Sequence, residues 1–332
     1  MNSVSVIVIT FNNSSTIKDC LASLGEQSRK DFEVILVDNN SYDNTSEVVE
    51  SIQPVLDFPL KTFHLDRNLG FAGGNNFALK QAAGGYIALL NPDAVAENFW
   101  LEELIRAMDS HSEVGICASK IIDDKINVID SAGDIYTPVF KGFKRGEGEN
   151  SKRFSEQEYI FGACAGAALY RRKMIEEVGF LDEDFFLIHE DTDLNFRAQL
   201  SGWKVFYVPA AIVHHKVRST IGPMSHAAIY YSLRNSELVR IKNIPFRVLL
   251  RCAPDVLIGA LAEFVYFAIK HKQVKLYLKA KLDAFRLFPK MLRKRTVIRK
   301  NKKISNRDLL NLLTPIWQKD FVLAKLKKLL YA

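Results

Sequence analysis

The chain has 332 residues, of which 48% are hydrophobic and 25% charged. This composition is typical of a globular protein and excludes a mainly disordered chain. The formal charge of +7 is unevenly divided, because residues 1–239 carry 22 Lys and Arg against 33 Asp and Glu, whereas residues 240–332 carry 23 against 5. A basic segment of this kind usually meets nucleic acid or the anionic face of a membrane, and composition does not choose between them.

Cysteine usage and the apolar runs predict a cytoplasmic location. The four cysteines have neither CxxC spacing nor a dense framework, so we interpret them as free thiols in a reducing compartment. The first nine residues lack the basic start and the cleavage site of a signal peptide. The run 253–269 is interrupted by Pro254, Asp255 and Glu263 and is shorter than the roughly 20 residues of a membrane-spanning helix, so we expect none.

Aliphatic strands alternate with helices in the first hundred residues. The patterns predict strands at 4–9, 32–37 and 61–65, a fourth strand that leads to Asp93, and helices at 17–24, 46–52 and 77–83. This alternation is typical of a mostly parallel α/β sheet covered on both faces. Residues 1–95 are therefore expected to form a nucleotide-binding half.

The rest of the chain changes character twice. Residues 96 to about 230 mix a helix at 100–110, strands at 114–118, 165–170 and 205–208, and a Gly-rich, charged loop at 141–153 that we expect to be mobile. From Tyr230 onward helical patterns with many lysines dominate. We expect a catalytic domain at 1–235 and a basic amphipathic helical region at 236–332.

Polar residues follow each predicted strand of the first half. Thr10, Asp38, Asp66 and Asp93 all fall at the carboxyl ends of strands, where open α/β sheets bind ligands. Asp38 can bond a nucleobase or a ribose, or cap the turn 39–45, and the pattern leaves both open.

The segment Asn91-Pro92-Asp93 is a candidate metal site. Its amide and carboxylate are two positions apart and can point the same way. Such hard oxygen ligands favour Mg²⁺ or Mn²⁺, which would bridge a diphosphate. An ordinary β-turn is the alternative.

Asp66, Arg67 and Asn68 open a Gly-rich segment that contains Gly70, Gly73 and Gly74 and leads to a predicted helix. Its backbone N–H groups and Arg67 can approach a diphosphate, although the segment fits no dinucleotide fingerprint. A structural turn remains the alternative.

Two further motifs lie in the second half. Glu190 and Asp191 precede a helical pattern, where an acid either serves as a general base or stabilises the helix dipole. His214 and His215 follow a strand, and because adjacent strand residues face opposite sides, at most one can serve as a metal ligand.

Together these motifs resemble those of the inverting glycosyltransferases of family 2, which have a GT-A fold, and most of all the rhamnosyltransferase-like branch. The matching segments are VIVITFN at 6–12, VDNNSYDNT at 37–45, NLGFAGGNN at 68–76, LLNPDA at 89–94, GAAL at 166–169, FFLIHEDTD at 185–193, and His214. The usual metal motif of the family is Asp-x-Asp, and here Asn91 takes its first position.

The resemblance implies roles for these residues. Asp191 would be the catalytic base, Glu190 would contact the acceptor or orient the base, and Asp93 and His214 would hold a divalent metal, Mg²⁺ or Mn²⁺. The nucleotide-binding set would be Thr10, Phe11, Asn12, Asp38, Asp66, Arg67, Asn68 and Asn91. The reaction implied is an in-line displacement with inversion and no covalent intermediate. Residues 96–235 would be the acceptor half.

The resemblance also implies the partners. The donor would be a dTDP- or UDP-sugar, with rhamnose as the sugar suggested by the branch. The acceptor would be a polyprenyl-diphosphate-linked sugar or a polysaccharide of the cell envelope.

For the basic tail, physical chemistry leaves several uses open. Basic amphipathic helices suit the anionic inner leaflet, which would make the protein peripheral on the cytoplasmic face of the membrane. The alternatives are a helical cap packed on the catalytic domain and a homodimer.

Two rival functions fit the sequence less well. A nucleotidyltransferase would usually have glycine and a cation in the first loop, and Thr10–Thr16 has neither. A nucleic-acid-binding protein would use the basic tail, but the acidic first part weighs against it and we expect no nucleic acid partner.

Overall fold

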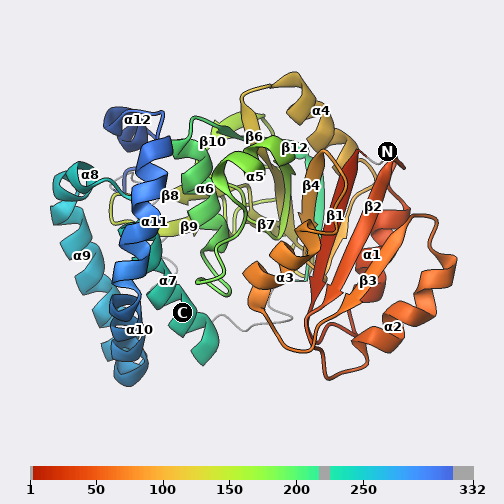
Figure 1. Ribbon diagram of the computed structural model, residues 1–332, viewed down its shortest axis with the longest axis horizontal. Helices are drawn as coiled ribbons and strands as arrows, with labels where there is room; N and C mark the ends of the chain where they lie inside the picture. The colour runs from red at the N-terminus through yellow and green to blue at the C-terminus, as the bar shows by residue number, and fades with distance from the viewer. Residues whose placement is uncertain (1–2, 217–224, 317–332) are drawn as a thin grey trace.

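A mixed sheet forms the centre of the molecule (Figure 1). The computed structural model describes residues 3–216 and 225–316. The strands follow one another in the order β10-β12-β6-β11-β4-β1-β2-β3, with β5 on β12 and β7 on β6. Their bounds are β1 Val4–Thr10, β2 Phe32–Asp38, β3 Leu60–His64, β4 Tyr86–Leu90, β5 Ala94–Ala96, β6 Val114–Asp123, β7 Val128–Ser131, β10 Glu158–Ile160, β11 Ala167–Arg171 and β12 Lys204–His215.

The sheet is parallel where the sequence predicted a nucleotide-binding half. Strands β4, β1, β2 and β3 pair in parallel, whereas β11 is antiparallel to both of its neighbours. The parallel direction returns between β6 and β12. A separate two-stranded sheet consists of β8 (Asp134–Tyr136) and β9 (Gly142–Lys144).

Helices cover both faces because the central strands are apolar on both sides. In β1, Val4, Val6 and Val8 belong to one core cluster, whereas Ile7 and Ile9 belong to another. The first cluster contains α1 (Ile17–Gly25), α2 (Thr45–Ile52, followed by a 3₁₀ turn Gln53–Val55) and α4 (Trp100–Ser110). The second contains α3 (Gly70–Leu79), α5 (Arg172–Val178) and α6 (Glu190–Leu200). The predicted α/β class is confirmed.

The C-terminal helices pack on the preceding part of the chain through a third core. They are α7 His226–Asn243, α8 Phe246–Arg251, α9 Ala253–Phe264, a π-helix Val265–Lys270, α10 Val274–Arg286, α11 Phe288–Asn301 and α12 Asn306–Asn311. Phe196 and Leu200 of α6 share this core with Leu238 of α7 and Met291 of α11. Helix α7 runs straight through the boundary expected at residue 235.

Three local expectations need correction. The Gly-rich segment is a helix from Gly70 onward. Its glycines allow the helix to lie close to the sheet, since a Cβ on Gly74 would lie 2.9 Å from Cγ2 of Ile9 in β1. The segment 141–153 begins with β9, and its later turn is hydrogen-bonded to Ile129 of β7. The predicted strand 205–208 and the strand-like run that precedes the two histidines form one strand, β12, which includes His214 and His215.

Two findings concern the apolar runs and the cysteines. Within residues 3–216 and 225–316, no helix is both long enough and apolar enough to cross a bilayer. None of the four cysteines, all of them described, forms a disulfide.

Candidate functional site

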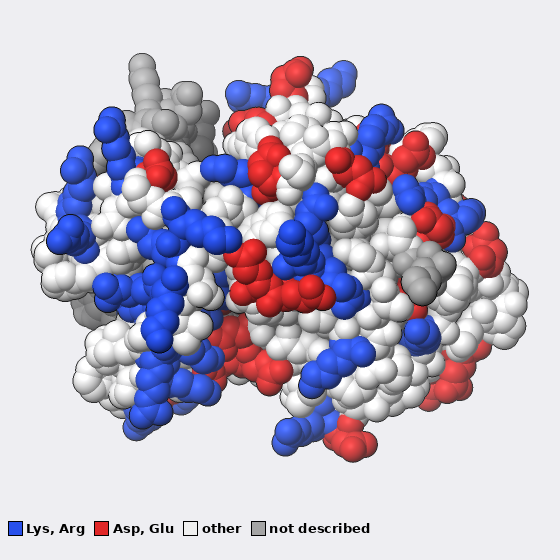
Figure 2. Space-filling model, turned by 45° about the horizontal axis from the view of Figure 1, so that its top comes forward, with Lys and Arg blue, Asp and Glu red and all other residues white. Residues whose placement is uncertain are grey.

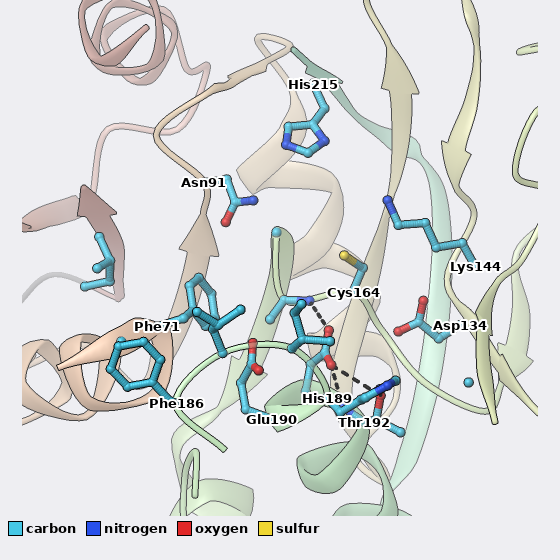
Figure 3. A pocket seen from close by; sticks show the side chains of 18 of the residues that line it. Phe71, Asn91, Asp134, Lys144, Cys164, Phe186, His189, Glu190, Thr192 and His215 are labelled. Atoms are coloured by element: carbon cyan, nitrogen blue, oxygen red, sulfur yellow. Dashed lines mark hydrogen bonds between the residues drawn. The ribbon is translucent and has the colours of Figure 1, made fainter. Parts of the chain in front are cut away.

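A pocket of about 460 Å³ opens beside the carboxyl ends of β1 and β4. Side chains from distant parts of the chain line it: Phe11, Asn68, Asn91 and Asp93 from the first half, and Asp134, Lys144, Glu190, Asp191 and His215 from the second. Figure 3 shows His215 and Asn91 on one side of it, and Glu190 with His189 on the other. The structure therefore brings the predicted metal residue Asp93 and the predicted base Asp191 to one cavity.

The histidine beside Asp93 is His215. Its Nε2 lies 3.1 Å from Oδ1 of Asp93, and its Nδ1 lies 3.3 Å from Oδ2 of Asp130. His214, which the sequence favoured, instead places Nε2 2.9 Å from Oε1 of Glu97. His215 therefore replaces His214 as the candidate metal ligand beside Asp93. Adjacent strand residues face opposite sides, and the register of β12 turns His215 toward the pocket.

Charge explains the cluster around His215. Burial by itself lowers the pKa of His215, but hydrogen bonds with Asp130 and Asp93 outweigh burial and raise the pKa to about 9. Lys144 also lies 2.7 and 2.8 Å from the two carboxylate oxygens of Asp130. Positive charge between the two carboxylates is therefore favourable, whether a proton on the imidazole or a metal ion in its place supplies that charge.

These residues fit a divalent metal. A carboxylate, an imidazole and a second carboxylate that orients the imidazole form a common metal-binding arrangement. In the described part of the chain, no three His, Cys, Asp or Glu side chains converge as a complete metal cage. Mg²⁺ commonly takes only one or two protein carboxylates and completes its coordination with water and substrate phosphates, so a two-residue site is sufficient.

On the opposite side, Asp191 is held by the backbone. Its Oδ1 accepts a hydrogen bond of 2.6 Å from the N–H of Thr192, and its Oδ2 accepts one of 3.3 Å from the N–H of Ala165. Burial raises the pKa of this carboxyl, and the two N–H groups partly oppose the shift. A fixed, half-buried carboxylate with a raised pKa has the properties of a general base.

Two more acids lie near Asp191. Glu190 is buried, and among the described residues its Oε2 has no hydrogen-bond partner. Burial, and after it the charge of Asp191, raise the pKa of Glu190 well above its usual value. Asp134 faces the same cavity, and the same two causes raise its pKa well above the usual range. This side of the pocket therefore holds carboxyl groups that favour the protonated form and can both donate and accept hydrogen bonds, as hydroxyl partners also do.

The loops after β1 and β2 are tied to each other. Asn12 donates from its backbone N–H to Oγ of Ser41 at 2.9 Å and accepts from the N–H of Tyr42 at 2.9 Å. Asp38 accepts from the N–H of Ser41 at 3.0 Å and from the hydroxyl of Ser46 at 2.8 Å. Asp38 therefore does organise the turn, which was one of its two interpretations.

Not every predicted nucleotide residue lines the cavity. Phe11, Asn68 and Asn91 do, whereas Asp66 and Arg67 lie exposed outside it. Thr10 is fully buried, with its hydroxyl 3.2 Å from Oδ1 of Asn13.

Sequence reasoning missed several lining residues. Asp134, Lys144 and the partner Asp130 belong to short strands and turns with no recognisable motif, so no sequence signal marked them. Asn39 had a signal, since it lies in the quoted VDNNSYDNT segment. Its side chain bonds Asn68 at 3.0 Å and the N–H of Leu69 at 2.8 Å, and it thereby joins two of the loops.

Known proteins are similar to this chain in sequence. The model of the family "Glycosyl transferase family 2" matches residues 5–179. The N-acetylglucosaminyl-diphospho-decaprenol L-rhamnosyltransferase of Mycobacterium tuberculosis is 26% identical over 251 residues, which cover 68% of this chain and 80% of that protein. The poly-beta-1,6-N-acetyl-D-glucosamine synthase of Staphylococcus epidermidis is 25% identical over 238 residues, which cover 71% of this chain and 55% of that protein.

Solved structures show the same fold. S. aureus TarS 1-349 in complex with UDP-GlcNAc has a TM-score of 0.58 at 17% identity, over 93% of this chain and 90% of that one. GalNAc-T7 with UDP, GalNAc and Mn²⁺ has a TM-score of 0.61 at 16% identity, over 73% of this chain and 48% of that one. The chain thus spans about half the length of the S. epidermidis and GalNAc-T7 proteins. Because the family model covers more than half of its residues, the chain belongs to glycosyl transferase family 2 and has a GT-A-like fold.

Proposed function

We propose that this protein is an inverting glycosyltransferase that moves a sugar from a UDP or dTDP donor to an acceptor hydroxyl in cell-envelope glycan synthesis. The main observation that supports this proposal is the arrangement of one pocket, with Asp93 and His215 on one side and Glu190 and Asp191 on the other. A polyprenyl-diphosphate-linked sugar or a polysaccharide is the acceptor, and rhamnose is the candidate sugar. The named M. tuberculosis relative supports both choices.

In this mechanism Asp191 removes the proton from the acceptor hydroxyl as its oxygen attacks the anomeric carbon. Glu190 and Asp134 offer hydrogen-bond acceptors to neighbouring hydroxyls of the sugar. The nucleoside diphosphate leaves from the opposite face, so the configuration inverts. A divalent metal held by Asp93 and His215 would supply positive charge to the leaving diphosphate. The Mn²⁺ in the GalNAc-T7 structure supports this choice of ion.

The proposal is tested by calorimetric titration of the protein with UDP, dTDP and GDP, each with and without Mn²⁺. We expect metal-dependent binding of UDP or dTDP. His215→Ala should weaken that binding at least about tenfold, whereas the adjacent substitution His214→Ala should leave it unchanged. If both variants lost nucleotide affinity equally, the proposed metal site at Asp93 and His215 would be wrong. If the protein bound none of the three nucleotides, the proposed function would be wrong.

We further propose that the helical C-terminal region docks on an anionic membrane surface. Exposed apolar side chains occur on three helices of this region, including Leu257 of α9, Leu278 and Phe285 of α10, and Leu292 of α11. A groove of about 1080 Å³ between these helices is lined by Leu257, Phe285 and Leu292 and also by Arg295 and Arg299. Apolar surface combined with cations matches the acyl chains and phosphates of one leaflet.

A further inference from the structure

The backbone just before the proposed base is strained. Phe186, Ile188 and His189 have φ angles of 65°, 65° and 72°, in the left-handed region that residues other than glycine avoid. Such a conformation is energetically costly and persists only where surrounding structure holds it. This segment leads directly into α6, whose second residue is Asp191. Whatever holds the segment therefore sets the position of the base.

A side chain from the C-terminal region holds it. Asn235 of α7 is fully buried, and its Nδ2 lies 2.9 Å from the carbonyl oxygen of Phe185, 2.8 Å from that of Leu187 and 2.7 Å from that of Ile188. Its Oδ1 accepts a hydrogen bond of 2.8 Å from Nε of Arg234. Three acceptors around the nitrogen and a donor at the oxygen define the orientation of the amide.

Neighbouring residues also contact the segment before Asp191. Nη2 of Arg234 donates to the carbonyl oxygens of Asp184 and Phe185 at 2.7 and 3.0 Å. The ring of Tyr231 stacks on Phe186, which lines the pocket, with centroids 5.4 Å apart. On the other side, the N–H of Ala72 in α3 donates to the carbonyl oxygen of Phe186 at 3.1 Å. The segment is thus held between the first half of the chain and helix α7.

The same helix also anchors the first turn of α6. Asp193 is fully buried and accepts hydrogen bonds of 2.8 Å from both Lys242 and Asn243 of α7. Two residues before it, Asp191 faces the cavity. Helix α7 therefore contacts the chain on both sides of the base.

We propose that Asn235 is a positioning residue for catalysis: its amide holds the strained segment Phe185–Ile188 and thereby aims Asp191 into the pocket. This inference rests on the proposed role of Asp191 as the base. It also assigns helix α7, which crosses the expected domain boundary, to the catalytic machinery. Asn235 itself touches no substrate, because only the segment that it holds lines the cavity.

The test compares Asn235→Asp with Leu238→Ala in the full-length protein. Asn235→Asp keeps the size of the side chain and removes the N–H donors. Leu238→Ala removes packing from the same helix but leaves the donors in place, since Leu238 is a fully buried core residue. A purely structural role for Asn235 would make the two variants behave alike.

Two readouts separate the variants. With the sugar donor found in a turnover screen of UDP- and dTDP-sugars, Asn235→Asp should lower kcat by about 10- to 100-fold, the scale expected for a misplacement of about 1 Å, with UDP affinity unchanged. Hydrogen–deuterium exchange needs no substrate, and amides of residues 185–192 should exchange at least about tenfold faster in Asn235→Asp than in Leu238→Ala.

The outcomes are distinct. Equal exchange of residues 185–192 in the two variants would overturn the role of Asn235. If Asp191→Asn kept near-normal turnover, the proposed base would be wrong, whatever Asn235 does. Loss of activity in Asp191→Asn, combined with a kcat of Asn235→Asp equal to that of Leu238→Ala, would reject the positioning role alone.

Discussion

At the scale of single residues, the pocket separates its charges. His215 lies with Asp93 and Asp130, whereas Glu190, Asp191 and Asp134 lie among themselves with raised pKa values. The first group is suited to a leaving diphosphate and its metal. The second is suited to hydroxyls, and Asp191 is the member whose two oxygens are both held by backbone N–H groups.

Asp191→Asn should therefore lower the transfer rate by about 10²- to 10⁴-fold, the usual contribution of a general base. Nucleotide binding should stay within about twofold of the parent, because Asp191 lies on the side of the pocket away from Asp93. Rates are measured with the donor identified in the screen, and binding is measured with UDP and Mn²⁺. A parallel loss of binding and turnover would point to a structural role instead.

The same substitution should change how stability depends on pH. Because burial raises the pKa of Asp191 in the folded chain, the unfolded chain ionises first as the pH rises from about 4. The native carboxyl therefore destabilises the fold at neutral pH and contributes nothing at lower pH, where both states are protonated. Asp191→Asn should raise the Tm at pH 7 by roughly 2 °C, and the gain should vanish near pH 4. An equal gain at both pH values would exclude this linkage.

At the scale of elements, glycine allows helix α3 to lie close to its neighbours. Gly70 has a φ of 72°, and a Cβ there would lie 2.5 Å from both the carbonyl oxygen and the ring of Phe186. The helix can thus begin directly against the strained segment that precedes Asp191. The Gly-rich segment, which the sequence suggested to be a loop, is therefore the place where the two halves of the site come into close contact.

Gly70→Ala should destabilise the protein more than Gly148→Ala. Gly148 has a φ of 82°, but no atom lies within 4 Å of the position that a Cβ would take there, so Ala costs only about 1–2 kcal/mol for its backbone conformation. Gly70→Ala adds the clash with Phe186, about 1–3 kcal/mol more. Urea unfolding of the two variants measures the difference, and equal midpoints at equal m-values would show that Phe186 moves aside freely.

At the scale of the whole molecule, part of the basic charge of the C-terminal region pairs with acids earlier in the chain. Lys242 pairs with Asp182 and Asp193, and Lys294 pairs with Asp182 and Asp184. These cations bind the acidic surface of the catalytic domain, as the helical-cap interpretation expects. Figure 2 shows Lys and Arg side chains gathered in a band over the helical side of the molecule, beside a cluster of acidic side chains.

Other cations of this region remain exposed. Arg299 has no ion-pair partner within residues 3–216 and 225–316, and it lines the apolar groove of the proposed membrane surface. The helical-cap interpretation and the proposed membrane surface are therefore compatible, since they rest on different side chains.

The membrane proposal predicts that the full-length protein sediments with vesicles that contain about one-third anionic phospholipid, and not with neutral ones. The double substitution Leu257→Ser and Phe285→Ser should reduce the bound fraction severalfold. Val55→Ser, at a side chain that is 80% exposed outside this region, should not change it. If sedimentation is absent and a concentration-dependent dimer is lost in the same double variant, the face binds a second copy.

Sequence by itself determined the α/β class, most of the longer elements and the two motifs that meet in the pocket. Apolar periodicity reports which residues face a core, so long, buried strands such as β1 and β2 were predictable. The short strands β5 and β7–β10 carry too few residues for a period, and Asp130, Asp134 and Lys144 were therefore missed.

Tertiary structure alone decided the contacts between distant segments. The choice of His215 over His214 depends on the register of β12, which a pattern of apolar residues does not define where the strand ends. The side chain of Asn235 bonds the backbone carbonyls of Phe185, Leu187 and Ile188, which lie 50, 48 and 47 positions away in the sequence. Local sequence encodes propensity and burial, whereas such hydrogen bonds exist only once the core has brought α6 and α7 together.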